Sequence, residues 1–137
     1  MSFEVPIERG KVREFARSVH ADPGNHARNG APIPPTFLTT ARLTWASSDQ
    51  NPLNSLGFDR SRLLHAGEEY RFFGELPRVG QVLNASSSIA EQYSKSGKRG
   101  GTMRFAVIVT EFSDASGDVV AEQRTTYVET AKPPKEE

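Results

Sequence analysis

The sequence predicts an α+β protein in which a curved antiparallel sheet wraps around one central helix, at about residues 35–47. Residues 68–128 contain four strand-like runs separated by turn-forming residues, which is typical of an antiparallel sheet. The segment before them contains a helix-like stretch with one apolar face. A single helix packed on a single sheet would bury both apolar faces, and this is why we expect the architecture.

The chain has 137 residues, no cysteine, and seventeen basic and seventeen acidic residues. This length suits one domain with its own core. We expect that domain over residues 1–130 and a disordered tail over residues 131–137. Without cysteine there is no disulfide, cysteine-ligated zinc or cysteine nucleophile. The balanced charge provides no field for nucleic acid, and no apolar run approaches ~18 residues. We therefore expect a cytoplasmic protein without a metal, a nucleic-acid partner or a membrane span.

The first predicted element is a short amphipathic helix over residues 8–20. Its apolar side chains stand at i, i+3, i+4 and i+7, which places them on one helix face: Val12, Phe15, Ala16 and Val19. A loop over residues 21–33 follows, because turn-forming residues are concentrated there without periodicity. Loops held between packed elements often carry function.

The central helix has a well-defined expected start. Pro35 suits the first turn, where a missing amide hydrogen costs nothing, and Thr36 can cap the helix. The apolar face contains Phe37, Leu38, Ala41 and Trp45. The amides of Thr36, Phe37 and Leu38 are free donors at the positive end of the helix dipole, so they can either receive a substrate oxygen or serve simple capping. After this helix, residues 49–62 read as a surface connection.

Four strands are expected next, over residues 68–73, 82–93, 102–112 and 119–128, and their spacing predicts a meander. Period-two patterning predicts which side chains of the two middle strands face the helix. They are Leu83, Ala85, Ile89 and Tyr93 on one strand and Met103, Phe105, Val107 and Val109 on the next. The aromatic residues Phe37, Trp45, Tyr70, Phe72 and Phe105 are expected mainly in the core.

Several blocks of the chain, in order, resemble the MaoC-like dehydratases, and specifically their N-terminal, fatty-acid-synthase-type dehydratase half. The similarity lies in residues 7–16, 31–37, 64–70, 79–83, 95–105 and 114–122. It includes the segments Ala31-Pro32-Ile33-Pro34-Pro35-Thr36-Phe37 and Leu64-His65-Ala66-Gly67-Glu68. The resemblance implies a hot-dog fold, but a fold alone does not determine function.

The resemblance also implies an activity, which is hydration of enoyl thioesters or dehydration of 3-hydroxyacyl thioesters. Coenzyme A or acyl carrier protein carries the acyl group, and no further cofactor is expected. Such chemistry needs acid and base groups and donors for an enolate-like oxygen. The family motif is Asp-x-Asn-Pro, an apolar residue and His, whereas this chain has Asp22-Pro23-Gly24-Asn25-His26. Asp22 and His26 are the candidate catalytic residues and Asn25 a candidate substrate contact, although the same residues can merely form a turn.

Other polar residues are weaker candidates. His20 and His65 are expected to be structural. Lys95, Lys98 and Arg99 lie in a glycine-rich hairpin and can contact the phosphates of coenzyme A or of a carrier-protein phosphopantetheine. A solvated turn with lysines that protect the sheet edge is the alternative.

Three functions remain open at this stage. The first is a subunit of a (3R)-hydroxyacyl-thioester dehydratase or enoyl-thioester hydratase, acting as a homodimer or beside a second hot-dog subunit that holds the intact motif. The heterodimeric type II fatty-acid dehydratases of mycobacteria are the nearest analogy. The second is a hot-dog thioesterase, and the third is a non-catalytic acyl-binding module. A dimer is expected in each case, because a small half-barrel leaves open sheet edges.

Overall fold

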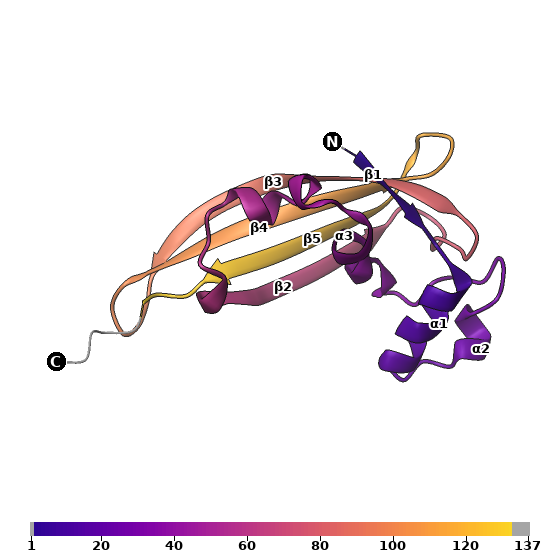
Figure 1. Ribbon diagram of the computed structural model, residues 1–137, viewed down its shortest axis with the longest axis horizontal. Helices are drawn as coiled ribbons and strands as arrows, with labels where there is room; N and C mark the ends of the chain where they lie inside the picture. Colours follow the sequence, from indigo (N-terminus) through magenta and orange to yellow (C-terminus); the bar gives the residue numbers. More distant parts are fainter. Residues whose placement is uncertain (1, 133–137) are drawn as a thin grey trace.

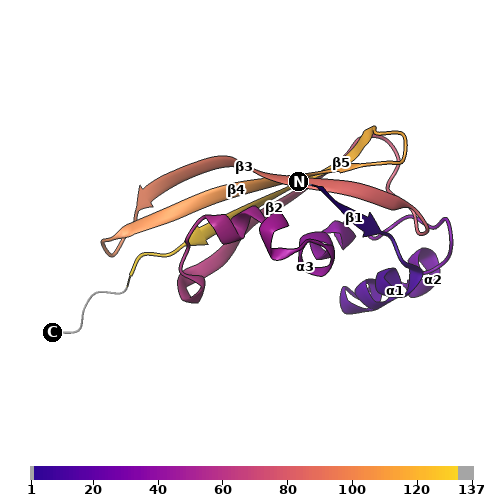
Figure 2. The ribbon, with the colours of Figure 1, turned by 45° about the horizontal axis from the view of Figure 1, so that its top comes forward.

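The computed structural model describes residues 2–132 and contains one five-stranded antiparallel sheet with its helices on one face (Figures 1 and 2). The strand order in the sheet is β1-β3-β4-β5-β2. The strands are β1 (Ser2–Pro6), β2 (Leu63–Phe72), β3 (Val82–Ser96), β4 (Thr102–Ser113) and β5 (Val119–Glu129). The predicted helix-on-sheet architecture is therefore confirmed. Residues 133–137 of the predicted tail lie outside the described part.

The predicted four-strand meander is wrong in one connection. β3, β4 and β5 do follow one another as neighbours, but β2 pairs with β5 and not with β3. β2 also begins earlier than expected, at Leu63. Sequence spacing identifies strands but not the strands that each pairs with. Here the chain between β2 and β3 crosses to the other side of the sheet, where β3 lies between β1 and β4.

β1 was missed by the sequence analysis. It pairs with β3, with Phe3 opposite Ala85 and Val5 opposite Leu83. Its alternate residues Phe3 and Val5, and Ile7 just after it, are buried. The alternation is clear, but the run is only five residues long, and such short runs are weak signals.

Two α-helices precede the central one: α1 (Arg9–Ser18) and α2 (Pro23–His26). α1 confirms the first predicted helix with slightly shorter bounds. α2 is a single helical turn, whereas one of the two interpretations of residues 22–26 was a plain turn. Both lie at one end of the sheet, next to the tip of β1 (Figure 1).

The central helix is shorter than predicted and is not α-helical throughout. It starts as the 3₁₀ helix η1 (Phe37–Thr40) and continues as α3 (Ala41–Trp45). The hydroxyl of Thr40 donates to the carbonyl of Phe37 at 3.0 Å, and such local bonding by threonine competes with the regular helix ladder. Thr36 makes no side-chain capping bond. Three further 3₁₀ turns follow: η2 (Ser48–Gln50), η3 (Pro52–Ser55) and η4 (Arg60–Arg62).

The predicted inner face of β4 is also wrong. The residues that face the helix side are the alternate set Ala106, Ile108, Thr110 and Phe112. Phe105, Val107 and Val109 therefore point to the outer face. In β3, Leu83, Ala85 and Ile89 do lie on the inner face, but the register shifts between Ile89 and Glu91. This bulge moves Tyr93 to the outer face, where its ring stacks on Phe105 with centroids 4.8 Å apart.

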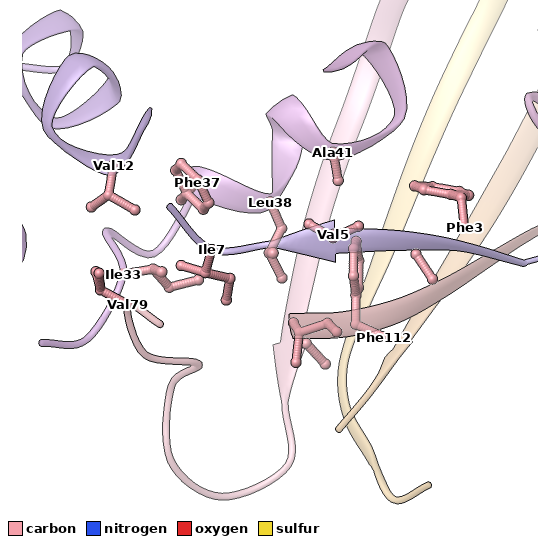
Figure 3. Close-up of a cluster of buried hydrophobic side chains, with 13 residues drawn as sticks. Phe3, Val5, Ile7, Val12, Ile33, Phe37, Leu38, Ala41, Val79 and Phe112 are labelled. Atoms are coloured by element: carbon pink, nitrogen blue, oxygen red, sulfur yellow. The ribbon is translucent and has the colours of Figure 1, made fainter. Parts of the chain in front are cut away.

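The apolar core lies between the central helix and one end of the sheet (Figure 3). Phe37, Leu38 and Ala41 of the helix are fully buried there. They pack with residues of β1, α1, β3, β4 and β5, among them Val5, Val12, Leu83, Phe112 and Ala121. Of the aromatic residues expected in the core, Phe37 is fully buried, and Trp45, Tyr70 and Phe72 pack against the cluster.

Candidate functional site

The structure assigns separate local roles to Asp22 and His26. Asp22 is the N-cap of α2, and its Oδ1 accepts a hydrogen bond from the amide of Gly24 at 2.9 Å. Nδ1 of His26 lies 2.8 Å from the carbonyl oxygen of Pro32. A carbonyl only accepts, so Nδ1 is the donor, and the neutral ring keeps its lone pair on Nε2. No hydrogen bond joins Asp22 to His26 within residues 2–132. Their catalytic role stays a prediction.

The start of the central helix offers fewer free donors than expected. The amide of Phe37 donates to the carbonyl of Pro34 at 3.0 Å, and the amide of Thr39 donates to Thr36 at 3.1 Å. Phe37 and Leu38 are fully buried, whereas Thr36 is exposed. Asn25 is exposed on α2. A substrate role for these residues stays a prediction.

The predicted basic hairpin joins β3 to β4 and borders a groove of about 650 Å³. Lys98 and Arg99 line this groove with Arg62 and Lys132, so four cations surround it. Lys95 lies further back, with its ammonium 5.7 Å from the centre of the Tyr93 ring and 5.5 Å from that of Phe105. The groove is suited to phosphate, but the phosphate-binding role of Lys98 and Arg99 stays a prediction.

The structure also forms a pocket that the sequence analysis did not predict. This inner polar pocket has a volume of about 240 Å³ and lies between the central helix, the connection after it and the inner face of β2 and β5. Its lining residues are Thr39, Arg42, Leu43, Asn51, Leu53, Arg60, His65, Glu68, Gln123 and Tyr127. Residues from three distant parts of the chain meet here.

Glu68 is the centre of a hydrogen-bond network in this pocket. Its Oε1 accepts from Nε2 of Gln123 at 2.6 Å and from the hydroxyl of Thr125 at 3.2 Å. Its Oε2 lies 2.7 Å from Nε2 of His65. Gln123 and Thr125 are both 2% exposed. Three donors can therefore hold the Glu68 carboxylate in one orientation, and His65 carries a counter-charge whenever it is protonated.

Arg42 enters the same network from α3, where it is only 7% exposed. Its Nη2 donates to the hydroxyls of Thr125 at 3.1 Å and Tyr127 at 3.2 Å. Its carbon Cζ lies 5.6 Å from the centre of the Tyr127 ring. Its Nε and Nη1 are buried without a hydrogen-bond partner, as is Oε1 of Gln123. Two of the three guanidinium nitrogens of Arg42 are therefore left without a partner.

Tyr70, beside the pocket, and Glu129, further along β5, both have shifted pKa values. Burial raises the pKa of Tyr70, so its hydroxyl stays protonated. Glu129, at the end of β5, has its pKa lowered to about 2, chiefly by hydrogen bonds from Arg104 and then by one from the amide of Asp59. Nε and Nη2 of Arg104 both lie 2.9 Å from the Glu129 carboxylate, which is a bidentate pair.

Sequence reasoning treated His65 as structural and did not consider Arg42, Glu68 or Gln123. The useful signal was the polar residue at every second position of β5, namely Gln123, Thr125 and Tyr127. On the buried face of a sheet, such a row indicates either a structural network or a site. Residues 2–132 contain no cluster of three or more His, Asp or Glu side chains placed to hold a metal ion. In the same residues, no helix is both long and apolar enough to cross a membrane.

Solved structures with the same fold include complexes of two different subunits. The C-terminally truncated HadBC (3R-hydroxyacyl-ACP dehydratase) complex from Mycobacterium tuberculosis matches with 19% identity and a TM-score of 0.70, over 93% of this chain and 94% of that one. The ChsH1-ChsH2 complex from the same organism matches with 12% identity and a TM-score of 0.76, over 98% and 85%. These likenesses confirm the hot-dog fold.

A structure described as a MaoC-like dehydratase matches with 22% identity and a TM-score of 0.71, and the match covers 96% of this chain but only 40% of that longer one. No curated protein matches the chain. The model of the family described as "FAS1-like, dehydratase domain region" matches residues 2–123, which is most of the chain. This protein therefore belongs to the family of FAS1-like dehydratase domains.

Proposed function

We propose that this chain is a subunit of a (3R)-hydroxyacyl-thioester dehydratase, or of an enoyl-thioester hydratase, that acts on acyl groups carried on coenzyme A or acyl carrier protein. The observation that carries this proposal is the family match over residues 2–123. The fold shared with the HadBC dehydratase complex supports it. Both proposed reactions are the same equilibrium approached from opposite sides.

In this proposal His26 is the group that moves a proton. The bond from its Nδ1 to Pro32 fixes the ring and leaves Nε2 as the acceptor, which suits a general base. Asp22 is the proposed second group, and its Oδ2 can act while its Oδ1 caps α2. Phosphates of the carrier would contact Lys98 and Arg99 in the groove at the hairpin.

A second hot-dog subunit is the proposed partner. Asp22 is engaged in capping α2 and does not bond to His26, so the acid and base are not assembled as a pair within one chain. A partner that carries an ordinary Asp-x-Asn-Pro-x-His motif would supply the acid that His26 lacks here, and this chain would also bind part of the acyl group. β1 and β2 are the two sheet edges through which such a dimer can form.

One observation favours a purely acyl-binding role as the second candidate, namely that Asp22 caps α2 and makes no hydrogen bond to His26 within residues 2–132. In that case the chain contributes a pocket and an interface, and all proton transfer takes place in the partner. The two candidates differ in what removal of the His26 imidazole does to turnover.

The test is hydration of crotonyl-coenzyme A by the purified chain alone and mixed with a motif-bearing hot-dog protein. We expect little turnover alone and full turnover in the mixture. If His26 is a general base, His26→Ala lowers kcat by about two to four decades. His20→Asn is the matched control, because His20 is exposed with a φ of 59°, which Asn tolerates.

Each result discriminates between the candidates. Full turnover by the single chain that is abolished in His26→Ala would refute the partner model. Turnover in the mixture that His26→Ala leaves unchanged would support the acyl-binding role. Absence of turnover in a mixture in which the two proteins form a stable complex would contradict the dehydratase proposal.

A further inference from the structure

We propose that the cationic groove at the hairpin between β3 and β4 acts in trans: it holds the phosphates of an acyl thioester whose acyl group reacts in the second subunit. That subunit joins this chain along the free edge of β3. The thioester and the second subunit rest on the proposed function, whereas the distance between the groove and His26 does not.

The groove and His26 lie at opposite ends of the chain. His26 bonds to Pro32, and Pro32 forms a β-bridge with Arg78, just ahead of the start of β3. Lys98 and Arg99 follow the end of the same strand. β3 has 15 residues, which at about 3.3 Å per residue span roughly 50 Å. Figure 1 shows the same separation between α2 and the hairpin.

One thioester molecule cannot bridge that separation. About thirteen bonds join its sulfur to the nearer phosphate, and at about 1.3 Å of advance per bond this arm spans roughly 17 Å. The reacting carbon adds about 4 Å at one end, and the ribose 3′-phosphate of coenzyme A adds roughly 10 Å at the other. The total of roughly 30 Å falls well short of roughly 50 Å. Phosphates bound in this groove therefore belong to a thioester that does not react at His26 of the same chain.

Three cations of the groove are available to such phosphates. Lys98, Arg99 and Lys132 are exposed, and within residues 2–132 none of them pairs with a carboxylate. The fourth cation, Arg62, already pairs with two carboxylates. Phosphate oxygens accept from ammonium and guanidinium donors, and the volume of about 650 Å³ has room for a ribose phosphate as well.

The free edge of β3 offers the second subunit a place beside the groove. On this side of the sheet, β1 pairs only with residues 82–86 of β3. Along residues 87–96, β4 lies on one side of β3, and no strand of residues 2–132 lies on the other. Residues 90–96 are all exposed. Such an edge leaves backbone N–H and C=O groups unpaired, and these accept a further strand.

An antiparallel strand of a second hot-dog subunit fits this edge and brings its own reacting groups to the groove. The added strand starts where β3 ends. In a partner with the same fold, the motif precedes that strand, as residues 22–26 precede β3 here. If the two strands overlap along residues 87–96 or 90–96, the hairpin lies roughly 10–20 Å from the start of the partner's strand. One thioester can therefore join the groove to the partner's reacting groups.

The first test asks which subunit the acyl end of a bound thioester touches. A coenzyme A thioester with a diazirine at the end of a short acyl chain is photolysed in the complex of this chain with a motif-bearing hot-dog protein. Mass spectrometry of the two intact subunits reports the label on each. We expect the double variant Lys98→Glu, Arg99→Glu to lower labelling of the partner at least fivefold and to leave labelling of this chain unchanged. A loss of label from this chain instead would overturn the proposal.

The matched control is the double variant Arg9→Glu, Arg13→Glu. It makes the same change of charge at two exposed arginines of α1, at the opposite end of the molecule (Figure 1). Labelling of the partner should equal that of the wild type. Equal losses in the two double variants would show that only net charge matters, and would overturn the groove as a site.

Turnover by the complex separates this proposal from the proposed function. We expect Lys98→Glu, Arg99→Glu to raise KM for crotonyl-coenzyme A at least tenfold and to leave KM for S-crotonyl-N-acetylcysteamine, which lacks every phosphate, unchanged. An unchanged KM for crotonyl-coenzyme A would make the hairpin a solvated turn and overturn the proposal. Labelling of the partner without turnover of either thioester would refute the proposed function but not the site in trans.

The docking edge is tested with an introduced cysteine, because the chain has none. Gln92→Cys lies on the free edge of β3, and Glu69→Cys is an exposed position on β2, at the opposite edge of the sheet. We expect a maleimide that carries a bulky polyethylene glycol to prevent complex formation in size-exclusion chromatography when attached at position 92, and not at position 69. Loss of the complex at position 69 alone would place the second subunit on β2 and overturn the proposed edge.

Discussion

The inner face of the sheet changes character along its length. At the end next to α1, one row across the strands consists of Phe72, Ala121, Phe112 and Ala85, which are all apolar. The next inward-facing row consists of Tyr70, Gln123, Thr110 and Ser87, which are all polar. The same helix packs over both regions and gives each a matching side chain, Leu38 to the apolar end and Arg42 to the polar one.

The apolar and polar ends of the inner face compensate in different ways for the loss of contact with water. Side chains of the apolar end exclude water and contact one another, and their contribution scales with the apolar area that they bury. The polar end satisfies its groups in pairs, such as the hydroxyls of Ser87 and Thr110 at 2.7 Å. Pairing is incomplete at Arg42 and Gln123, and this is where the pocket lies. The apolar end stabilises the fold, and the polar end leaves room for a ligand.

The largest expected effect is at the apolar end. Phe112→Ala should lower the free energy of unfolding by about 3–5 kcal/mol, because it removes a fully buried ring and leaves a cavity. Phe105→Ala on the outer face of the same strand is the control and should cost clearly less, since Phe105 is only half-buried. Urea unfolding of both variants measures the difference. Equal losses would show that the outer face carries as much of the core as the inner one.

A smaller and pH-dependent effect is expected at Glu129, beyond the polar row. Its folded-state pKa of about 2 lies below the ordinary value of 4.5, so its ion pair with Arg104 stabilises the fold fully above about pH 5. That stabilisation is lost as the pH falls from there towards 2. Glu129→Gln should therefore lower the melting temperature at pH 7, and the gap to the wild type should close on acidification. A gap that is constant between pH 7 and pH 3 would contradict this.

The smallest effect on stability is expected at the pocket itself. Arg42→Met removes the hydrogen bonds to Thr125 and Tyr127 but also relieves the desolvation of a buried guanidinium, so the two contributions should offset each other to within about 1 kcal/mol. Thermal melting of the ligand-free protein measures this. A loss comparable to that of Phe112→Ala would mean that Arg42 belongs to the structural core and not to a binding site.

The sequence by itself determined the architecture, because the signals for it are local. Alternation identified the strands β3, β4 and β5, and the apolar face with Phe37, Leu38 and Ala41 identified the helix that lies against the sheet. The resemblance in ordered blocks led to the family that the match over residues 2–123 shows. Each of these signals lies within one segment of the chain.

Only the tertiary structure decided which edge β2 joins, which face of β4 is buried, and where the pocket lies. The extra residue at the bulge between Ile89 and Glu91 moves Tyr93 to the outer face. The alternating sequence pattern does not reveal where such an extra residue stands. Arg42, Glu68 and Gln123 stand far apart in the chain and meet only because β2 pairs with β5 beneath α3. The missing partners of Arg42 are a property of the folded protein only. In the unfolded chain water solvates the guanidinium, so the free-energy cost of leaving it unpaired arises when folding buries it.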